Sequence, residues 1–255
     1  MKKVIFISLL ALTLAPIAGA IDRLPANVTP GGVTVVVPEA AIDNAPPLEV
    51  ITIVHYKKDF VKPDQPGRGN KAESCYGFIS GLAKLVATED VLINASGSGL
   101  NATDVLNDFT ASALTWDNET ATTIFGSFTL DNTANFDSIA DGRNEISFGN
   151  YSQDGVIAVT RVWGYFSGKP QSRYISQFDM IFDTDYIWGD AELNPALMDF
   201  RNIAVHELGH TLGLTDIYTT TCQEVTMYGY SDNGETKKRT LEAPDIAGLE
   251  TLYGI

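Results

Sequence analysis

The pattern of hydrophobic and polar positions predicts a globular unit of strands and helices from about residue 81 onward. Short runs rich in β-branched and aromatic residues are typical of strands. Such runs cover 91–95, 123–130, 145–148, 156–166 and 174–182. Apolar residues at helical spacing follow the first run, at Val105, Phe109, Ala113 and Trp116, and Asn101 or Thr103 could cap this helix. We therefore expect a strand, a helix and then four more strands.

Two further helices are predicted in the last quarter of the chain. One covers roughly residues 199–212. The other covers 244–253, where Ile246, Leu249 and Leu252 or Tyr253 recur at helical spacing. Strands and helices together form one domain, to which we assign residues 81–255.

Residues 21–80 differ from this domain and are interpreted as an N-terminal extension or pro-segment. Prolines and glycines are frequent up to about residue 72, and so many turn-forming residues argue against a packed domain. One apolar, strand-like run interrupts them at 48–56. The segment is compatible with a pro-segment, a linker or an arm packed on the domain. His55 within it is most simply a structural or surface histidine.

The first residues have the pattern of a secretory signal peptide. Met1 is followed by two lysines, an apolar stretch covers 4–14, and the sequence Ala-Gly-Ala at 18–20 resembles a cleavage site. The apolar stretch is too short to span a bilayer comfortably. We expect removal of residues 1–20 and a secreted, extracellular protein with no membrane span in the mature chain.

The composition argues against two classes of partner, nucleic acids and anionic membrane surfaces. The 255 residues carry a formal net charge of −15, and removal of residues 1–20 would delete two lysines and no acidic residue, which gives −17. So acidic a protein is a poor partner for nucleic acid or an anionic membrane surface. Carboxylates such as Asp183, Asp185 and Asp190 could instead hold Ca²⁺, although a solvated acidic loop explains them equally well.

The candidate chemistry is concentrated in the sequence HELGH at residues 206–210. Positions four apart lie on one face of a helix, so His206 and His210 can hold one metal ion between their imidazoles. Glu207 is then placed as the general base of the HExxH zinc arrangement. Gly213 permits a sharp turn that can bring Asp216 back as a third ligand. Three protein ligands leave the fourth position of Zn²⁺ for water, which is typical of a catalytic site.

Two other residues compete with Asp216 for the role of third ligand. His55 is the only other histidine, but it lies far upstream. A downstream glutamate, as in thermolysin-like sites, would need a second helix, and Glu224 lies in a stretch without helical apolar spacing. We therefore favour Asp216.

The residues from His206 to Met227 resemble the metzincin signature HExxHxxGxxH followed by a Met-turn. Asp216 stands where that signature has its last histidine, as in families that resemble snapalysin. The stretches 182–188, 224–228 and 245–254 also look like the end of the last strand, the Met-turn and the closing helix of a matrixin-like catalytic domain. The resemblance covers about residues 81–255 and is closest in the last third.

This resemblance implies an α+β fold of the metzincin type, with a mixed, twisted sheet of about five strands, an active-site helix, a Met-turn and a C-terminal helix. Met227 would form an apolar floor beneath the histidines. The implied function is that of a secreted zinc metalloendopeptidase, which hydrolyses peptide bonds through a zinc-bound water activated by Glu207. The structural zinc site usual in matrixins is not expected, because no histidine lies between His55 and His206.

The expected partner is a peptide or protein substrate, bound by a monomer. No substrate-binding residues are assigned, but an extended substrate would lie by strand addition against an edge strand within 156–166. A second function class stays open. A non-catalytic secreted zinc-binding or adhesion module would use the metal only to stabilise its fold.

Two cysteines, Cys75 and Cys222, suit one disulfide in an oxidising compartment. The rival interpretation follows from the matrixin resemblance, in which a thiolate of Cys75 would cap the zinc and inhibit the enzyme. The sequence around Cys75 lacks the Pro-Arg-Cys-Gly pattern of that device. We therefore favour the disulfide.

Overall fold

The computed structural model describes residues 34–36, 48–58, 60 and 75–254. The predicted signal peptide lies outside the described residues, as does much of the predicted extension. No helix within the described ranges has the length and apolar character needed to cross a membrane.

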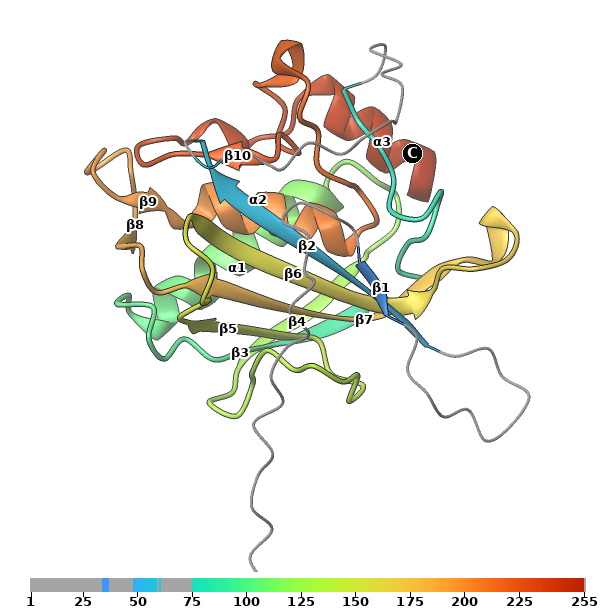
Figure 1. The fold of residues 1–255 in the computed structure, drawn as a ribbon, viewed down its shortest axis with the longest axis horizontal. Coiled ribbons are helices and arrows are strands. Elements are labelled where there is room, and N and C mark those ends of the chain that lie inside the picture. The colour runs from blue at the N-terminus through green and yellow to red at the C-terminus, as the bar shows by residue number, and fades with distance from the viewer. Residues whose placement is uncertain (1–33, 37–47, 59, 61–74, 255) are drawn as a thin grey trace, which may run out of the picture.

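One large sheet runs through the molecule (Figure 1). Its strands are β1 (Thr34–Val36), β2 (Glu49–Lys57), β3 (Glu89–Ile93), β4 (Phe125–Leu130), β5 (Glu145–Gly149), β6 (Val156–Tyr165), β7 (Tyr174–Asp183) and β10 (Tyr230–Ser231). They are ordered β1-β2-β6-β7-β5-β3-β4, and β10 pairs with β2 outside this path. The strands β3, β4, β5 and β7 are mutually parallel, whereas β6 is antiparallel to both β2 and β7. A small second sheet joins β8 (Trp188–Gly189) to β9 (Met198–Asp199).

The helices are α1 (Ala102–Asp117), α2 (Phe200–Thr211) and α3 (Ala243–Tyr253), with short 3₁₀ helices at Pro170–Ser172, Thr220–Cys222 and Lys237–Arg239. Figure 1 shows α1 and α2 behind the sheet, on one of its faces. Buried apolar side chains of β5 and β7 form one core with those of both helices. The indole of Trp116 in α1 also donates a hydrogen bond of 2.8 Å to the Val205 carbonyl oxygen in α2, which ties the two helices together.

The α+β fold, its central strands and its helices confirm the sequence prediction. Each predicted strand begins and ends within two residues of an observed one, from β3 to β7. The Asn101 side chain caps α1 by accepting a hydrogen bond of 2.8 Å from the Thr103 backbone N–H, so Asn101 is the cap and Thr103 is not. Asp199 caps α2 in the same way through the Asn202 N–H.

The predicted strand-like run at 48–56 forms β2, which lies inside the sheet. The strand pairs with β6 from Glu49 to Tyr56 on one side and with β1 and β10 on the other. The expectation of a free edge within 156–166 is therefore wrong, because β6 has a neighbour along both sides. Residue alternation predicts that a segment is a strand, but it does not tell which strand will lie beside it.

Candidate metal centre

Helix α2 presents the two histidines of the HELGH sequence on one face. The helix ends directly after them because Gly213 adopts a φ of 104°, in the left-handed region that favours glycine. A Cβ atom at this position would overlap the Ala83 carbonyl oxygen. The Gly213 N–H donates to the His210 carbonyl oxygen at 3.0 Å, so the chain turns back toward the histidines at once.

The two imidazoles are oriented by backbone carbonyl oxygens. The Nδ1 atom of His206 lies 2.7 Å from the Thr226 oxygen, and Nδ1 of His210 lies 2.9 Å from the Leu214 oxygen. A carbonyl oxygen only accepts, so each Nδ1 carries the hydrogen and each Nε2 offers a lone pair. These two Nε2 atoms lie 3.1 Å apart. Two lone pairs at that distance repel each other, which is the arrangement that a cation between them would relieve.

Asp216 completes this group of ligand atoms. Its Oδ1 lies 3.2 Å from His206 Nε2 and 3.4 Å from His210 Nε2, and it has no hydrogen-bond donor. The other oxygen, Oδ2, accepts from the Tyr218 hydroxyl at 2.9 Å. Tetrahedral zinc with ligand bonds of about 2.0–2.1 Å needs donor atoms about 3.3 Å apart. The residues therefore fit zinc, with three protein ligands and a buried oxygen that has no other partner.

Glu207 lies beside these ligands and is fully buried. Its Oε2 accepts a hydrogen bond of 2.6 Å from Thr160 in β6, and its Oε1 accepts one of 2.9 Å from Nδ1 of His55. Burial raises the pKa of Glu207 to about 7. A carboxyl group with a pKa near neutrality is suited to accept and return a proton.

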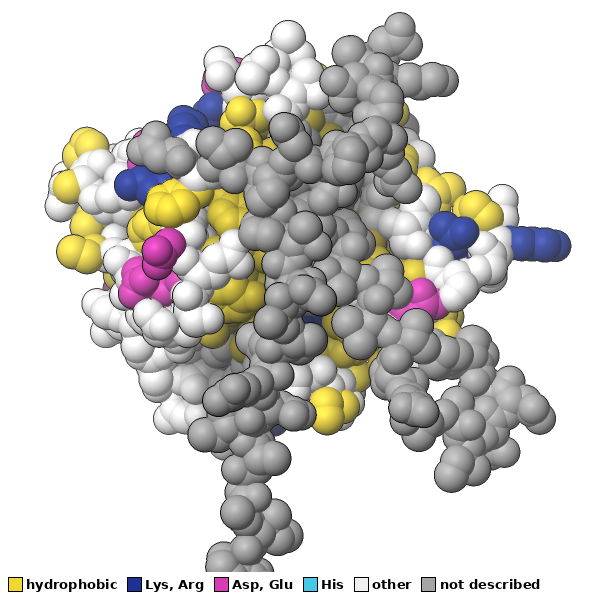
Figure 2. All heavy atoms as spheres, in the orientation of Figure 1, with side chains coloured by type: hydrophobic (Ala, Val, Ile, Leu, Met, Phe, Trp, Pro, Cys, Tyr) yellow, Lys and Arg dark blue, Asp and Glu magenta, His cyan; other side chains and the backbone are white. Residues whose placement is uncertain are grey.

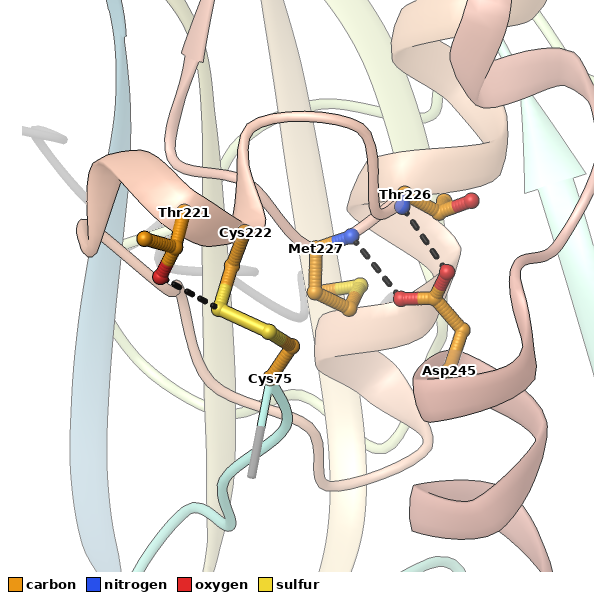
Figure 3. The surroundings of a disulfide bond; sticks show 6 residues. All are labelled: Cys75, Thr221, Cys222, Thr226, Met227 and Asp245. Atoms are coloured by element: carbon orange, nitrogen blue, oxygen red, sulfur yellow. Dashed lines mark hydrogen bonds between the residues drawn. A yellow bond between two sulfur atoms is a disulfide. The ribbon is translucent and has the colours of Figure 1, made fainter. Parts of the chain in front are cut away.

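The segment beneath the histidines is held by α3. Asp245 accepts hydrogen bonds from the Thr226 and Met227 backbone N–H groups at 2.9 and 3.1 Å (Figure 3). Met227 is completely buried and packs against Gly209 of α2, where any larger side chain would overlap its sulfur. Thr226 in turn accepts from His206, so α3 orients a candidate ligand through this turn.

Cys75 and Cys222 form a disulfide, as predicted (Figure 3). It joins the segment that precedes β3 to the 3₁₀ helix Thr220–Cys222, which precedes Met227. The described residues include no free cysteine, so the rival interpretation of Cys75 as an inhibitory thiol is wrong.

Comparison with known families agrees with this geometry. The sequence pattern of the matrixins matches residues 93–254 of the chain. The chain belongs to the matrixin family. Matrilysin of Rattus norvegicus is 36% identical over 76 residues, which cover 30% of this chain and 27% of the rat protein. The chain thus matches little more than a quarter of that relative. Family membership supports a metalloprotease, and the histidines and carboxylates of this matrixin are positioned to bind a metal.

The third histidine of this matrixin was not assigned to the site from its sequence. His55 is buried rather than at the surface, with its ring centroid 4.0 Å from that of His206. Its Nε2 lies 3.1 Å from the Ser231 hydroxyl and 3.3 Å from Nζ of Lys238, which is also fully buried. Figure 2 agrees, since no histidine is visible on the uncovered part of that face. His55 and Glu207 lie 152 positions apart, so no spacing rule could have joined them.

The other acidic candidates lie elsewhere. Glu224 is exposed and pairs with Lys237, away from the ligands. Asp183, Asp185 and Asp190 each have a different partner, in turn the Asp185 N–H, Asn150 and Arg239. The acidic group with converging oxygens in the described part of the chain is instead Asp137, Asp141 and Glu145. Calcium binding stays a prediction.

Proposed function

We propose that this matrixin is a secreted zinc-dependent endopeptidase. The observation that carries the proposal is the convergence of two imidazole Nε2 atoms and the unpartnered Asp216 Oδ1 within 3.1–3.4 Å of one another, next to Glu207. A closed structural site would supply a fourth protein ligand. Beside the three ligands here lies Glu207, a carboxylate of the type that serves as a general base.

Each residue of the centre has a distinct part in the proposed reaction. His206, His210 and Asp216 would hold the ion. Bound zinc would supply Lewis acidity, which acidifies water and polarises the scissile carbonyl. Glu207 would accept the proton of the attacking water on a carboxylate oxygen and return it to the leaving amine. The Thr160 hydroxyl, 2.6 Å from Oε2, holds the carboxylate in place.

The substrate class and location are part of the same proposal. Peptides or proteins are the expected substrates, by analogy with the metalloproteases of the family. Secretion is supported by the disulfide, which is typical of proteins in oxidising compartments.

A second candidate function is a secreted module in which the metal is purely structural. The observation that favours it is burial: His206, Glu207 and His210 have no exposed surface. In that case the metal would stabilise the fold without turning over a substrate.

The test is an assay of zinc content and casein cleavage on the full chain and on Glu207→Gln, before and after limited proteolysis. We expect one zinc per chain in both proteins, cleavage that a chelator abolishes, and a loss of about 100- to 10,000-fold in Glu207→Gln. The matched control is Glu224→Gln, which changes an exposed glutamate of the same domain and should leave cleavage unchanged. A Glu207→Gln protein that cleaves at the original rate would disprove the role of Glu207. Bound zinc without any cleavage would favour the structural module.

A further inference from the structure

Strand β2 packs against the candidate metal centre through His55, whose ring centroid lies 4.0 Å from that of His206. It follows β6 in an antiparallel register from Glu49 opposite Gly164 to Tyr56 opposite Val156. Its far end pairs with β10, which comes directly after the turn that contains Met227. In Figure 1 the strand crosses in front of α2. It thus lies between β6 and β10, where a peptide would have to lie to reach Glu207 by strand addition to β6.

One side chain of β2 engages the general base itself. Ile51, Ile53 and His55 alternate toward α2, and the two isoleucines join the main core. His55 donates to Glu207 Oε1 through Nδ1, since its Nε2 faces the donors of Ser231 and Lys238. With Thr160 on Oε2, both oxygens of Glu207 are already hydrogen-bonded. A water that gives its proton to Oε1 therefore has to share this oxygen with His55 or replace His55.

We propose that β2 is an intramolecular inhibitory strand, which occupies the place of a peptide substrate along β6 and blocks Glu207 with His55. This inference rests on the proposed peptidase function. Cleavage then requires β2 to leave its place beside β6.

The connectivity of the chain permits that departure. The part of the chain matched by the matrixin pattern begins at residue 93, long after β2. The disulfide joins Cys75, which also follows β2, to Cys222. A single cut between Lys58 and Cys75 would therefore leave β2 attached only by non-covalent contacts, while the disulfide would still tie the new end to the domain.

The contacts around His55 also differ from those of a permanent core. Lysine is seldom fully buried, yet Lys238 is, and its ammonium donates to the Tyr228 carbonyl oxygen and faces His55. Ser231 adds a hydroxyl to the same cluster. These polar groups can be hydrated once the strand leaves. Ile51 and Ile53 of the same strand would lose their apolar contacts with the main core, which opposes the departure.

The experiment uses the full chain with a specific protease site inserted between Lys58 and Cys75. Casein cleavage and the rate of zinc transfer to a coloured chelator are measured before cutting, after cutting without removing either piece, and after adding a synthetic peptide of residues 48–58. Covalent linkage holds a segment at an effective concentration on the order of millimolar. After the cut at nanomolar protein, we expect both rates to rise at least about 10-fold, and to rise further on dilution. The added peptide should reverse both changes.

Point variants of the uncut chain and of the peptide test whether His55 is the residue that inhibits cleavage. His55→Ala should raise cleavage by the uncut chain about 10-fold, because a hydrogen bond to a charged group is lost. Val54→Ala, on the opposite face of the same strand, is the matched control and should raise it less. If His55→Ala does not fold, His55→Gln is measured in its place. A 48–58 peptide carrying His55→Ala should inhibit about 10-fold more weakly than the original peptide.

The two readouts separate the failure of each proposal. If the uncut chain cleaves casein as fast as the cut chain and zinc transfer does not change, β2 is not inhibitory, while the peptidase function stands. If zinc transfer accelerates after the cut but no form cleaves casein, the peptidase function fails and takes the inhibitory role with it.

Discussion

The candidate metal centre has two sides that are held in different ways. On the α2 side, the two histidines are oriented by backbone carbonyl oxygens that lie 20 and 4 positions away in the sequence. On the β2 side, His55 is held by the side chains of Glu207 and Ser231, which lie 152 and 176 positions away. One side is built within a single stretch of chain. The other is brought in from a distant segment.

This difference indicates which side is a permanent part of the site. Backbone carbonyl oxygens leave each ligand histidine in one tautomer, so the metal-binding geometry exists without help from β2. The contacts of His55 are made between side chains across an interface, and both partners can bond to water instead. The α2 side should therefore bind zinc whether β2 is in place or displaced. The strand β2 should control only the access of substrate to the site.

The largest effect that separates the two sides concerns zinc affinity. We expect His210→Ala to weaken zinc binding by more than the roughly 10- to 100-fold loss that follows removal of a ligand's hydrogen-bond partner. His55→Ala should leave the affinity almost unchanged. The measurement is competition with a chelator of known affinity, at one pH and ionic strength. A larger loss in His55→Ala than in His210→Ala would break the comparison, because it would place the ion between His55, His206 and Glu207, whose ligand atoms also converge.

The same contrast explains how much of the molecule could be predicted from its sequence. Helix α2, its stop at Gly213 and the return of Asp216 lie within a single short stretch of chain, so periodicity and spacing were sufficient to predict them. The turn at Met227 followed from the resemblance to the metzincin signature. The strands β3 to β7 follow from their apolar runs. The disulfide followed from there being two cysteines in a chain with the features of a secreted protein.

What could not be predicted is the set of contacts made across long stretches of chain. The run that forms β2 is strand-like in sequence, but nothing in its alternation shows that β6 is its neighbour. His55 gave no signal beyond being the third histidine. Lys238 gave none at all, because lysine is ordinarily a surface residue and its burial depends on the arrival of β2.

A second prediction compares how much the contacts of Asp245, on the α2 side, and of Ser231, on the β2 side, contribute to the free energy of unfolding. Asp245 accepts from the backbone N–H groups of Thr226, Met227 and Glu242, so Asp245→Ala leaves three buried or partly buried donors unpaired. Each such donor costs about 1–3 kcal/mol, so we expect the free energy of unfolding to fall by at least about 3 kcal/mol. Ser231→Ala, which removes one hydroxyl partner of His55, should cost only about 1 kcal/mol.

Urea unfolding of both variants at a fixed free zinc concentration checks this order, because bound metal would otherwise add its own stabilisation. A larger loss in Ser231→Ala than in Asp245→Ala would mean that the β2 side carries more of the stability of the centre than the turn held by α3. The distinction between a permanent and a displaceable side would then have to be given up.

The smallest expected effect is that of Tyr218→Phe, and it refines the account of the α2 side. Tyr218 donates to Oδ2 of Asp216, which leaves Oδ1 directed at the two histidine nitrogens. Asp216 is thus the one ligand of this side held by a side chain, and not by the backbone. Without the hydroxyl, the carboxylate can rotate, and zinc affinity should fall about 10-fold, at the lower end of the range for a lost ligand partner. Chelator competition measures the change, with Tyr165→Phe on β6 as a control remote from the ligands. An unchanged affinity in Tyr218→Phe would show that the turn after Gly213 orients Asp216 by itself, so that all three ligands depend on the backbone alone.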